Sequence, residues 1–593
     1  MPKDANVAKG PRGSFRDRHR PIVAGTRHMV AAGHHLAAEA GFTILEAGGN
    51  AVDAGIAAII TLAVAQPDMV NVAGVAPIIL YLAETKEVVT ISGLGVWPKA
   101  ASVEYFQREH GGIIPEGVAR CVVPAAPDAW MTALEHFGTM SFGEVGAAAI
   151  RIADEGFAAH ELLSDRIKEY EEGYRRHPSN AEIYLSRGRP PEPGELFVQK
   201  DLARSLQYMA DVEKTTAAKG RVAGLRAARD AFYKGDIARA IVQFHQENGG
   251  LLRMEDFANF SVAIEPPVST AYKAYEVYAC GPWCQGAVFP QMLNMLEAFD
   301  LTGLGHNSPA YVHTITEAIK LAYSDRERYF GDPKFVDVPI DGLLSKDYAA
   351  IRRELIREGE AWPRMPPAGD PRGLKPVADD QLPEPEPTPL PGPVVSPDTM
   401  DTSYACVVDR HGNVFSGTPS DPSWDGVVVP GTGLTPSTRG CQSRVDPAHP
   451  SSVAPGKRPR LTPSPALVMK NGRPIMPIGT PGGDAQAQSM LQVFLNIAEF
   501  GMDVQSAVEA PRFMSQSFPN SFAPHQYFPG RLNLEPRMGQ GLGEALDAWG
   551  HGVYWWPDWF WRLGGVCVIL IDPNEGLLLA GADPRNESYA VGW

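Results

Sequence analysis

The stretch "PDTMDTSYACVVDRHGNVFSG" (Pro397–Gly417) joins two parts of the chain with opposite character. Upstream lies the proline-dense run "LPEPEPTPLPGPVVSP", which cannot pack a core and is expected to be extended and exposed. From Thr402 onward apolar residues alternate, and the turn "DRHGN" leads into a second apolar run, which predicts a β-hairpin. Thr402 therefore stands where a linker meets a strand, and it is either the first strand residue or a nucleophile.

A nucleophilic role for Thr402 requires a cut between Asp401 and Thr402. A threonine hydroxyl needs a base within hydrogen-bond reach, and a free α-amine, which titrates near about 7.7–8.0, can be that base. The same hydroxyl can make the cut by attacking the Asp401 carbonyl, forming an ester that water then opens. One residue would supply nucleophile and base, which suits a sequence with neither a P-loop nor a G-x-S-x-G motif.

The stretch "GTPGGD" (Gly479–Asp484) is a second candidate element, because it lies between a predicted strand and a helix that starts near Ala485. Adjacent glycines before a helix can point two backbone N–H groups at one anion, as in an oxyanion hole. A plain tight turn is the alternative interpretation.

Composition excludes several classes of function. The 593 residues are 44% hydrophobic and 21% charged, and the net charge of −16 argues against nucleic acid or an anionic membrane as a partner. Six scattered cysteines without a C-x-x-C pair argue against a disulfide scaffold and a zinc site, so we expect no metal and no cofactor. The N-terminus lacks the apolar region of a secretory signal, and the apolar run Ala51–Pro67 is interrupted by Asp53, so we expect a cytoplasmic protein.

The chain divides into four parts: a disordered N-terminus (1–20), a region of alternating strands and helices (21–360), a flexible proline-rich segment ending at the cut (361–401), and a second structured region (402–593). Two helices are predicted on either side of Gly48-Gly49-Asn50. A hairpin is predicted around Glu84-Thr85-Lys86. A further helix is predicted to end before Gly331 and Pro333.

Motifs along nearly the whole chain, from about Val23 to Trp593, resemble the γ-glutamyltranspeptidase family of N-terminal nucleophile hydrolases. They are "HHLAAEAGFTILEAGGNAVDA", "EAIKLAYSDRERYFGDP", "DTSYACVVDRHGN", "PGKRPRLTPSPALV", "GTPGG", "EAPRF" and "GADPRNESYAVGW". The resemblance implies an α+β fold, a four-layer αββα sandwich in which a large and a small subunit come from one precursor. It also leaves room for a homodimer of such heterodimers.

The resemblance assigns roles to individual residues. The nucleophile of the family falls on Thr402, its assisting threonine on Thr418 and the next hydroxyl on Ser420, and the two oxyanion glycines fall on Gly482 and Gly483. The cleavage site is then Asp401–Thr402.

Departures from the family pattern concern the substrate. Leu94 stands where members that take glutathione have an arginine that holds a carboxylate, and leucine cannot make that contact. The Ser-Ser pair of the family becomes Leu461-Thr462, the glutamyl-binding Asn becomes Pro422, and the stretch that binds the substrate amine now begins with Arg439. The amino-acid clamp is thus altered on both its carboxylate and its amine side.

Arg439 lies in "TRGCQSRVDPAHP", a stretch similar to that of a cytosolic branch of the family with oxamate amidohydrolase-like members. It either holds a substrate carboxylate or forms a structural ion pair with a nearby aspartate. Trp97 and the run "YWWPDWFW" (Tyr554–Trp561) either wall an acyl pocket or belong to the core.

The resulting prediction is an autoprocessing amidohydrolase, a zymogen that cleaves a small amide other than glutathione through an acyl-enzyme on Thr402, with Ser420, Arg439, Thr462 and Leu94 near the substrate. A γ-glutamyl transferase or glutathione hydrolase with a rebuilt clamp is the first alternative. An uncleaved, inactive precursor fold that acts as a binding protein is the second. Turnover of a γ-glutamyl anilide and the integrity of the purified chain discriminate among them.

Overall fold

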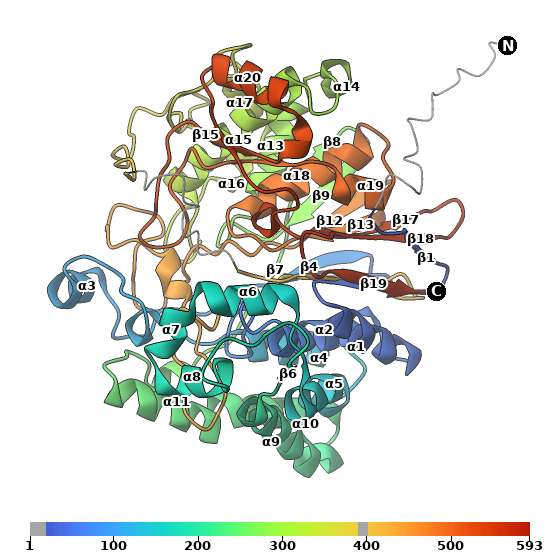
Figure 1. Cartoon of the computed structure of the whole chain (residues 1–593), viewed down its shortest axis with the longest axis vertical. Coiled ribbons are helices and arrows are strands. Elements are labelled where there is room, and N and C mark those ends of the chain that lie inside the picture. The colour runs from blue at the N-terminus through green and yellow to red at the C-terminus, as the bar shows by residue number, and fades with distance from the viewer. Residues whose placement is uncertain (1–18, 390–400) are drawn as a thin grey trace.

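Two β-sheets lie face to face between two layers of helices in the computed structural model, which describes residues 19–389 and 401–593 (Figure 1). The helices coloured blue to green in the lower half of the view cover one sheet, and those coloured green to red in the upper half cover the other. This is the α+β, four-layer αββα sandwich that the family resemblance implied.

The first sheet has seven strands and takes its members from both regions of the chain. Its order is β19 (Tyr589–Gly592), β2 (Met29–Ala32), β10 (Ala405–Val408), β11 (Val414–Gly417), β3 (Ile78–Leu82), β4 (Glu87–Ile91) and β7 (Ile264–Glu265). The predicted hairpin of β10 and β11 sits in its interior, and each of these strands pairs antiparallel with a strand from the first region of the chain. The two regions therefore share one sheet.

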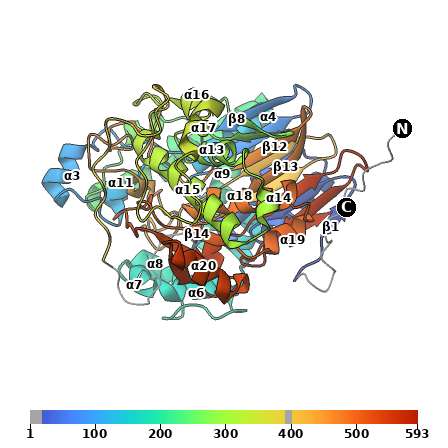
Figure 2. The same cartoon turned by 90° about the horizontal axis from the view of Figure 1, so that it is seen from above.

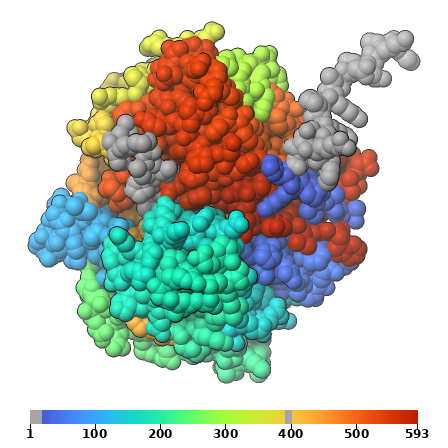
Figure 3. Space-filling view, in the orientation of Figure 1, coloured from blue at the N-terminus to red at the C-terminus, as the bar shows by residue number. Residues whose placement is uncertain are grey.

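The second sheet is built in the same mixed way. Its order is β1 (Val23–Gly25), β18 (Leu578–Ala582), β17 (Cys567–Ile571), β13 (Arg473–Gly479), β12 (Ala466–Lys470), β9 (Tyr275–Ala279) and β8 (Val268–Tyr272). Two smaller sheets pair β14 (Phe513–Ser515), β15 (Arg531–Leu534) and β16 (Gly552–Trp555), and β5 (Phe157–Ala158) with β6 (Leu196–Phe197). The space-filling view shows the late, red part of the chain lying directly against the earlier, cyan part (Figure 3).

Strand β10 is buried on both faces, which explains its nearly continuous apolar sequence. Tyr404, Cys406 and Val408 pack between the two sheets, whereas Ala405 and Val407 face the helices over the first sheet. Alternate side chains along the strand thus belong to two hydrophobic cores, one between the sheets and one under the helices.

Helices of the lower layer form the core over the first sheet; they include α1 (His35–Glu46), α2 (Ala51–Ala65), α4 (Ala126–Phe137), α5 (Phe142–Glu155), α9 (Lys200–Thr216), α10 (Arg221–Tyr233) and α11 (Asp236–Glu247). The upper layer includes α13 (Val288–Leu296), α15 (Pro309–Tyr329), α17 (Lys346–Arg353), α18 (Ala485–Ala498), α19 (Val504–Glu509) and α20 (Gln540–Ala548) (Figure 2). Shorter helices are α3 (Val103–His110), α6 (Glu161–Glu169), α7 (Glu171–Arg175), α8 (Pro178–Tyr184), α12 (Met254–Ala258), α14 (Leu301–Leu304) and α16 (Ile340–Leu343).

Predicted helix boundaries are confirmed and have a local cause. The Asn50 side chain accepts the N–H groups of Val52 and Asp53, and the Asp53 carboxylate accepts the Asn50 N–H, which is a complete capping box at the start of α2. The fifteen residues of α2 are all buried, so this helix is a core helix. Among the described residues no helix is both long and apolar enough to cross a membrane.

The described part of the proline-rich segment, residues 361–389, is tied to the body of the protein. The Thr388 N–H donates to the Tyr527 carbonyl at 2.8 Å, and the Tyr527 hydroxyl accepts the Met365 N–H at 2.8 Å. Between this segment and Arg444, His449 and His525 lies a cavity of about 740 Å³. Residues 1–18, nearly all of the predicted disordered N-terminus, and residues 390–400, part of the predicted flexible segment 361–401, lie outside the described residues.

Candidate active site

Thr402 is not part of a strand, contrary to the expectation that the β pattern begins there, because β10 starts at Ala405. Its φ of +94° is incompatible with a strand and unusual for a β-branched residue. The Thr402 N–H donates to the Met69 carbonyl at 3.0 Å, and the Ser403 N–H donates to the Pro419 carbonyl at 3.0 Å. These bonds fix a strained, fully buried backbone around the hydroxyl of Thr402.

The carbonyl before Thr402 meets the glycine turn. The Gly482 N–H donates to the Asp401 carbonyl oxygen at 3.2 Å, so the bond predicted to be cut is already polarised by one backbone donor. Gly482 has a φ of +118° and Gly483 one of +55°, backbone conformations that side chains rarely adopt. The predicted placement of "GTPGG" between a strand and a helix is confirmed by β13 and α18.

The Ser420 hydroxyl lies next to the Thr402 hydroxyl, with 2.6 Å between the Ser420 Oγ and the Thr402 Oγ1. The Thr402 hydroxyl also donates to the Asp401 Oδ1 at 3.0 Å. The Thr418 Oγ1 is buried and has no hydrogen-bond partner among the described residues, although its N–H donates to the Pro77 carbonyl at 3.0 Å. Of the two predicted hydroxyls, the structure brings Ser420 and not Thr418 into contact with Thr402.

Arg439 lies in a short 3₁₀ turn, Arg439–Gln442, and is fully buried. Its Nη2 is 2.5 Å from the Asp401 Oδ2 and 2.5 Å from the Ser420 Oγ, and its Nε is 3.3 Å from the Asp421 Oδ1. The guanidinium also lies over the Phe522 ring, 5.3 Å from its centre. Arg439 thus forms ion pairs with two aspartates in the precursor.

Asp421 is a site residue that the sequence interpretation missed. Burial raises the pKa of its carboxyl to about 7, Arg439 opposes that rise, and Asp401 adds to it. The carboxylate accepts the Ser437 hydroxyl at 2.8 Å and the Thr438 N–H at 3.1 Å. Its φ of +109° marks a sharp turn. The dipeptide Asp421-Pro422 was a turn signal in the sequence, but it could not indicate which residue the turn would face.

Thr462 is connected to the glycine turn through Gln285. The Gln285 amide donates to the carbonyls of Thr462 and Gly483, at 2.9 Å each, and the Gln442 amide donates to the Thr462 hydroxyl at 2.9 Å. Gln285 is a second residue that sequence reasoning missed, since a lone glutamine gives no signal. Together these bonds connect the carbonyl of Gly483 to Thr462 through Gln285 and stiffen the turn.

Leu94 lies in a buried apolar cluster with Val75, Cys280, Trp283, Cys284 and Leu461. Its side chain is 1% exposed. The position that holds an arginine in the family pattern is therefore part of the hydrophobic core here. A parallel β-bridge between Cys284 and Leu461 brings this cluster next to Thr462.

The aromatic residues that were candidates for an acyl pocket are distributed over several places. The Trp97 indole donates to the Ser443 Oγ at 2.9 Å and lies against Gly440, so it packs on the turn that carries Arg439. Trp556 belongs to a small buried cluster with Ala485 and Leu563. Trp559 lies over Arg537 and Arg585.

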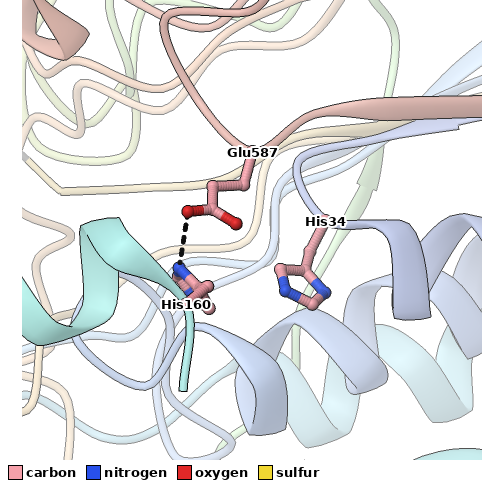
Figure 4. A group of neighbouring side chains, drawn as sticks. All are labelled: His34, His160 and Glu587. Atoms are coloured by element: carbon pink, nitrogen blue, oxygen red, sulfur yellow. Dashed lines mark ion pairs between the residues drawn. The ribbon is translucent and has the colours of Figure 1, made fainter. Parts of the chain in front are cut away.

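One group of side chains that approaches metal-ligand spacing is His34, His160 and Glu587 (Figure 4). The Leu36 N–H donates to the His34 Nδ1 at 3.2 Å, so the neutral ring carries its proton on Nε2, the nitrogen a cation would need. The His160 Nδ1 is 3.3 Å from a Glu587 oxygen; burial alone would lower the pKa of His160, but Glu587 outweighs it and the net shift is upward. These bonds favour a buried ion pair over a cation site.

A second such group, His313, Glu317 and His551, is also committed to internal bonds. The His313 Nδ1 lies 2.9 Å from the His551 Nε2, and the Glu317 carboxylate accepts the Lys320 ammonium at 2.7 Å with both side chains fully buried. An ammonium already neutralises the carboxylate that a cation would need.

Comparisons with known proteins identify the family. The γ-glutamyltranspeptidase family model matches residues 37–593. The acylase ACY 1 proenzyme of a Pseudomonas species is 32% identical over 90% of this chain and 88% of its own, and the glutathione hydrolase-like YwrD proenzyme of Bacillus subtilis is 32% identical over 96% and 99%. The crystal structure of a cephalosporin acylase from Bacillus halodurans superposes with a TM-score of 0.83 at 28% identity, covering 98% of this chain and 99% of that one. This chain therefore belongs to the γ-glutamyltranspeptidase family of N-terminal nucleophile hydrolases, as an amide-bond hydrolase or acyltransferase made as a precursor of a large and a small subunit.

Proposed function

We propose that this protein is an autoprocessing amidohydrolase that cuts itself between Asp401 and Thr402 and then cleaves a small amide through an acyl-enzyme on Thr402. The observation that carries the proposal is the strained Thr402, whose preceding carbonyl accepts the Gly482 N–H at 3.2 Å while its hydroxyl lies 2.6 Å from the Ser420 Oγ. A nucleophile, a polarised carbonyl and a neighbouring hydroxyl thus meet at one peptide bond.

Self-cleavage follows from these contacts. The Thr402 Oγ1 attacks the Asp401 carbonyl carbon, and its proton has two acceptors within reach, the Asp401 carboxylate at 3.0 Å and the Ser420 Oγ. The C–N bond breaks, the nitrogen of Thr402 takes a proton, and the acyl group is now an ester on Oγ1. Water then splits the ester into the Asp401 α-carboxylate and a free Thr402 hydroxyl. The positive φ of Thr402 supports the proposal because strain stored at a bond favours its rearrangement.

Turnover uses the same atoms with the new α-amine as base. The amine accepts the Oγ1 proton, Oγ1 attacks the substrate carbonyl, and the negative oxygen is stabilised by the N–H of Gly482, with Gly483 as the second donor. The proton goes to the leaving amine, and water hydrolyses the acyl-enzyme. The carbonyl of Met69, which accepts the Thr402 N–H in the precursor, lies in place to orient the α-amine.

The apolar surroundings of Leu94 support a substrate other than glutathione. A γ-glutamyl group carries an α-carboxylate, and a cluster of six apolar side chains offers it no charged partner. One of the relatives is named an acylase and another a glutathione hydrolase-like protein, so the family accommodates more than one acyl group. A cytoplasmic location stays a prediction.

Intact mass of the freshly purified protein tests the proposal. The wild type should give two fragments, Met1–Asp401 and Thr402–Trp593, and Thr402→Ala should give one chain. Thr402→Ser is the matched control, because it keeps the hydroxyl and should still be cut. A wild-type chain that stays whole after long incubation would refute the proposed mechanism.

A further inference from the structure

The side chain of Asp401 occupies the charged position of the site before any substrate can. Its Oδ2 is 2.5 Å from the Arg439 Nη2, its Oδ1 accepts the Thr402 hydroxyl at 3.0 Å, and its backbone carbonyl accepts the Gly482 N–H at 3.2 Å. The precursor therefore holds the aspartyl acyl group of residue 401 at its carbonyl end and at its carboxylate end. Between the scissile carbonyl and the carboxylate of that acyl group lie two carbon atoms, Cα and Cβ.

We propose that Asp401 marks the acyl subsite, and that the mature enzyme takes amides whose acyl group carries a carboxylate two carbons from the scissile carbonyl, as in a succinyl monoamide. This inference rests on the proposed function. In it, Arg439 is the specificity-determining residue and Asp401 is the first occupant of its subsite.

The chemistry of self-cleavage connects the two acyl groups. When the Asp401–Thr402 peptide bond rearranges, the Asp401 carbonyl carbon becomes bonded to the Thr402 Oγ1, and the nitrogen of Thr402 becomes a free amine. The acyl-enzyme of turnover has the same ester bond on the same oxygen beside the same amine. Both esters are then split by water, which supplies OH to the acyl carbon and H to Oγ1. The side chain of Asp401 therefore shows where the far end of an acyl group lies.

Charge gives the subsite its selectivity. Departure of the cleaved Asp401 leaves the Arg439 guanidinium, 1% exposed, with Asp421 at 3.3 Å from its Nε as the other ion-pair partner in the described structure. The Nη2 then keeps the Ser420 Oγ at 2.5 Å but loses its carboxylate acceptor, and the Ser420 hydroxyl loses the Asp401 Oδ1, which accepts it at 3.2 Å in the precursor. An acyl group without a carboxylate would leave the buried Arg439 guanidinium with one counter-ion fewer than in the precursor, and the loss of a buried charged partner costs more than a good contact gains.

Length is selected because Arg439 is held from several sides. Its backbone lies in the 3₁₀ turn, its Nε faces Asp421, and its guanidinium lies over Phe522. Gly440 of the same turn packs against Trp97, where an added Cβ would lie 2.4 Å from the indole. A guanidinium fixed in this way cannot retreat to admit one more methylene group.

The test uses the mature wild-type enzyme with p-nitroanilides of succinate, glutarate and butyrate. We expect kcat/KM for the succinyl anilide to exceed that for the glutaryl anilide by about 10-fold or more, and that for the uncharged butyryl anilide by at least about 100-fold. We also expect free succinate to inhibit competitively at lower concentration than glutarate or malonate. This second readout needs no variant.

A variant sharpens the assignment. In Arg439→Gln the preference for succinyl over butyryl anilide should collapse to within a few-fold, whereas Arg410→Gln, which removes an exposed cation on the β10–β11 turn, should keep it. If Arg439→Gln is not cut, the inhibition series on the wild type still decides.

The two proposals fail differently. A cleaved enzyme that turns over butyryl or glutaryl anilide at least as well as succinyl anilide, or that succinate inhibits no better than glutarate, would overturn the subsite and leave the Thr402 mechanism standing. An uncut chain that hydrolyses none of the three anilides would remove both.

Discussion

Two buried clusters next to the glycine turn handle charge in opposite ways. The Leu94 cluster, six apolar side chains, occupies the place where the family pattern has a carboxylate-binding arginine. The Arg439 cluster has an arginine, two aspartates and two hydroxyls that are at most 1% exposed. The comparison leads to the proposal that carboxylate recognition in this chain has moved from the Leu94 side of the site to the Arg439 side.

The largest effect is expected when a charge is moved back to the Leu94 side. Leu94→Arg places an unpaired guanidinium among apolar side chains, and its cost should exceed the roughly 3–5 kcal/mol of breaking a buried ion pair. The measurement is the denaturation midpoint in an uncleavable Thr402→Ala background, with Leu94→Met as the matched control, costing less than about 1.5 kcal/mol. A Leu94→Arg protein with Thr402 intact that is soluble, cuts itself and hydrolyses γ-glutamyl anilide would break the comparison.

Removing the charge from the Arg439 side should be the next largest effect. Arg439→Met leaves Asp401 and Asp421 buried beside each other, and the free energy of unfolding should fall by about 3–5 kcal/mol. Denaturant unfolding of the precursor in the Thr402→Ala background measures it. Adding Asp421→Asn should recover part of the loss, because one of the two unpaired carboxylates is then gone. No recovery would mean that Asp401 and Asp421 are not both neutralised by Arg439.

Several residues of the site were predicted from the sequence, but the partners with which they pair were not. The linker–strand junction at Thr402 and the glycine pair before a helix are local signals that left each role open, and the family resemblance then assigned the nucleophile to Thr402 and the oxyanion donors to Gly482 and Gly483. The partners of Arg439 were left open between a ligand and a structural aspartate, since Asp401 is 38 residues away in the sequence and becomes a neighbour only through the turn at Asp421.

The helices and the hairpin were predicted from local signals, whereas the arrangement of the two sheets was implied by the family resemblance. Helix-capping residues, glycines that end helices and alternating apolar residues in strands are local features of the sequence. The helices α1 and α2 and the hairpin of β10 and β11 form where these features lie. The start of β10 was placed three residues early, because apolar alternation does not reveal that Thr402 has a positive φ. Strain of this kind is imposed by tertiary contacts and gives no sequence signal.

Hydroxyl substitutions offer a smaller, more specific test. Ser420→Ala removes the group 2.6 Å from the Thr402 Oγ1 and should slow self-cleavage about 10- to 100-fold, the effect of one hydrogen bond near charge. Thr418→Val, which removes a buried hydroxyl without a partner in the described chain, should change the rate less than about threefold. Gel densitometry of the precursor over time measures both, and a reversed order would restore Thr418 as the assisting residue.

The last expected effect is a pH dependence of stability that comes from Asp421. Its folded-state pKa is raised to about 7, above the unfolded value of about 3.9, so its contribution to precursor stability is present below about pH 4 and is lost as the pH rises through 7. The slope for one group cannot exceed about 1.4 kcal/mol per pH unit. In the Thr402→Ala background, Asp421→Asn should therefore gain on its parent between pH 4 and 7 and run parallel above that range; a constant difference would contradict the assignment.

Trapping of the acyl-enzyme tests the central claim most directly. The mature enzyme is mixed with succinyl p-nitroanilide, quenched in acid within the first turnover, and the mass of the small subunit is measured. The account predicts that Thr402–Trp593 gains one succinyl group, that peptide mapping places it on Thr402, and that butyryl anilide leaves far less label. A small subunit that stays unlabelled while anilide is released, or a label on another residue, would contradict it.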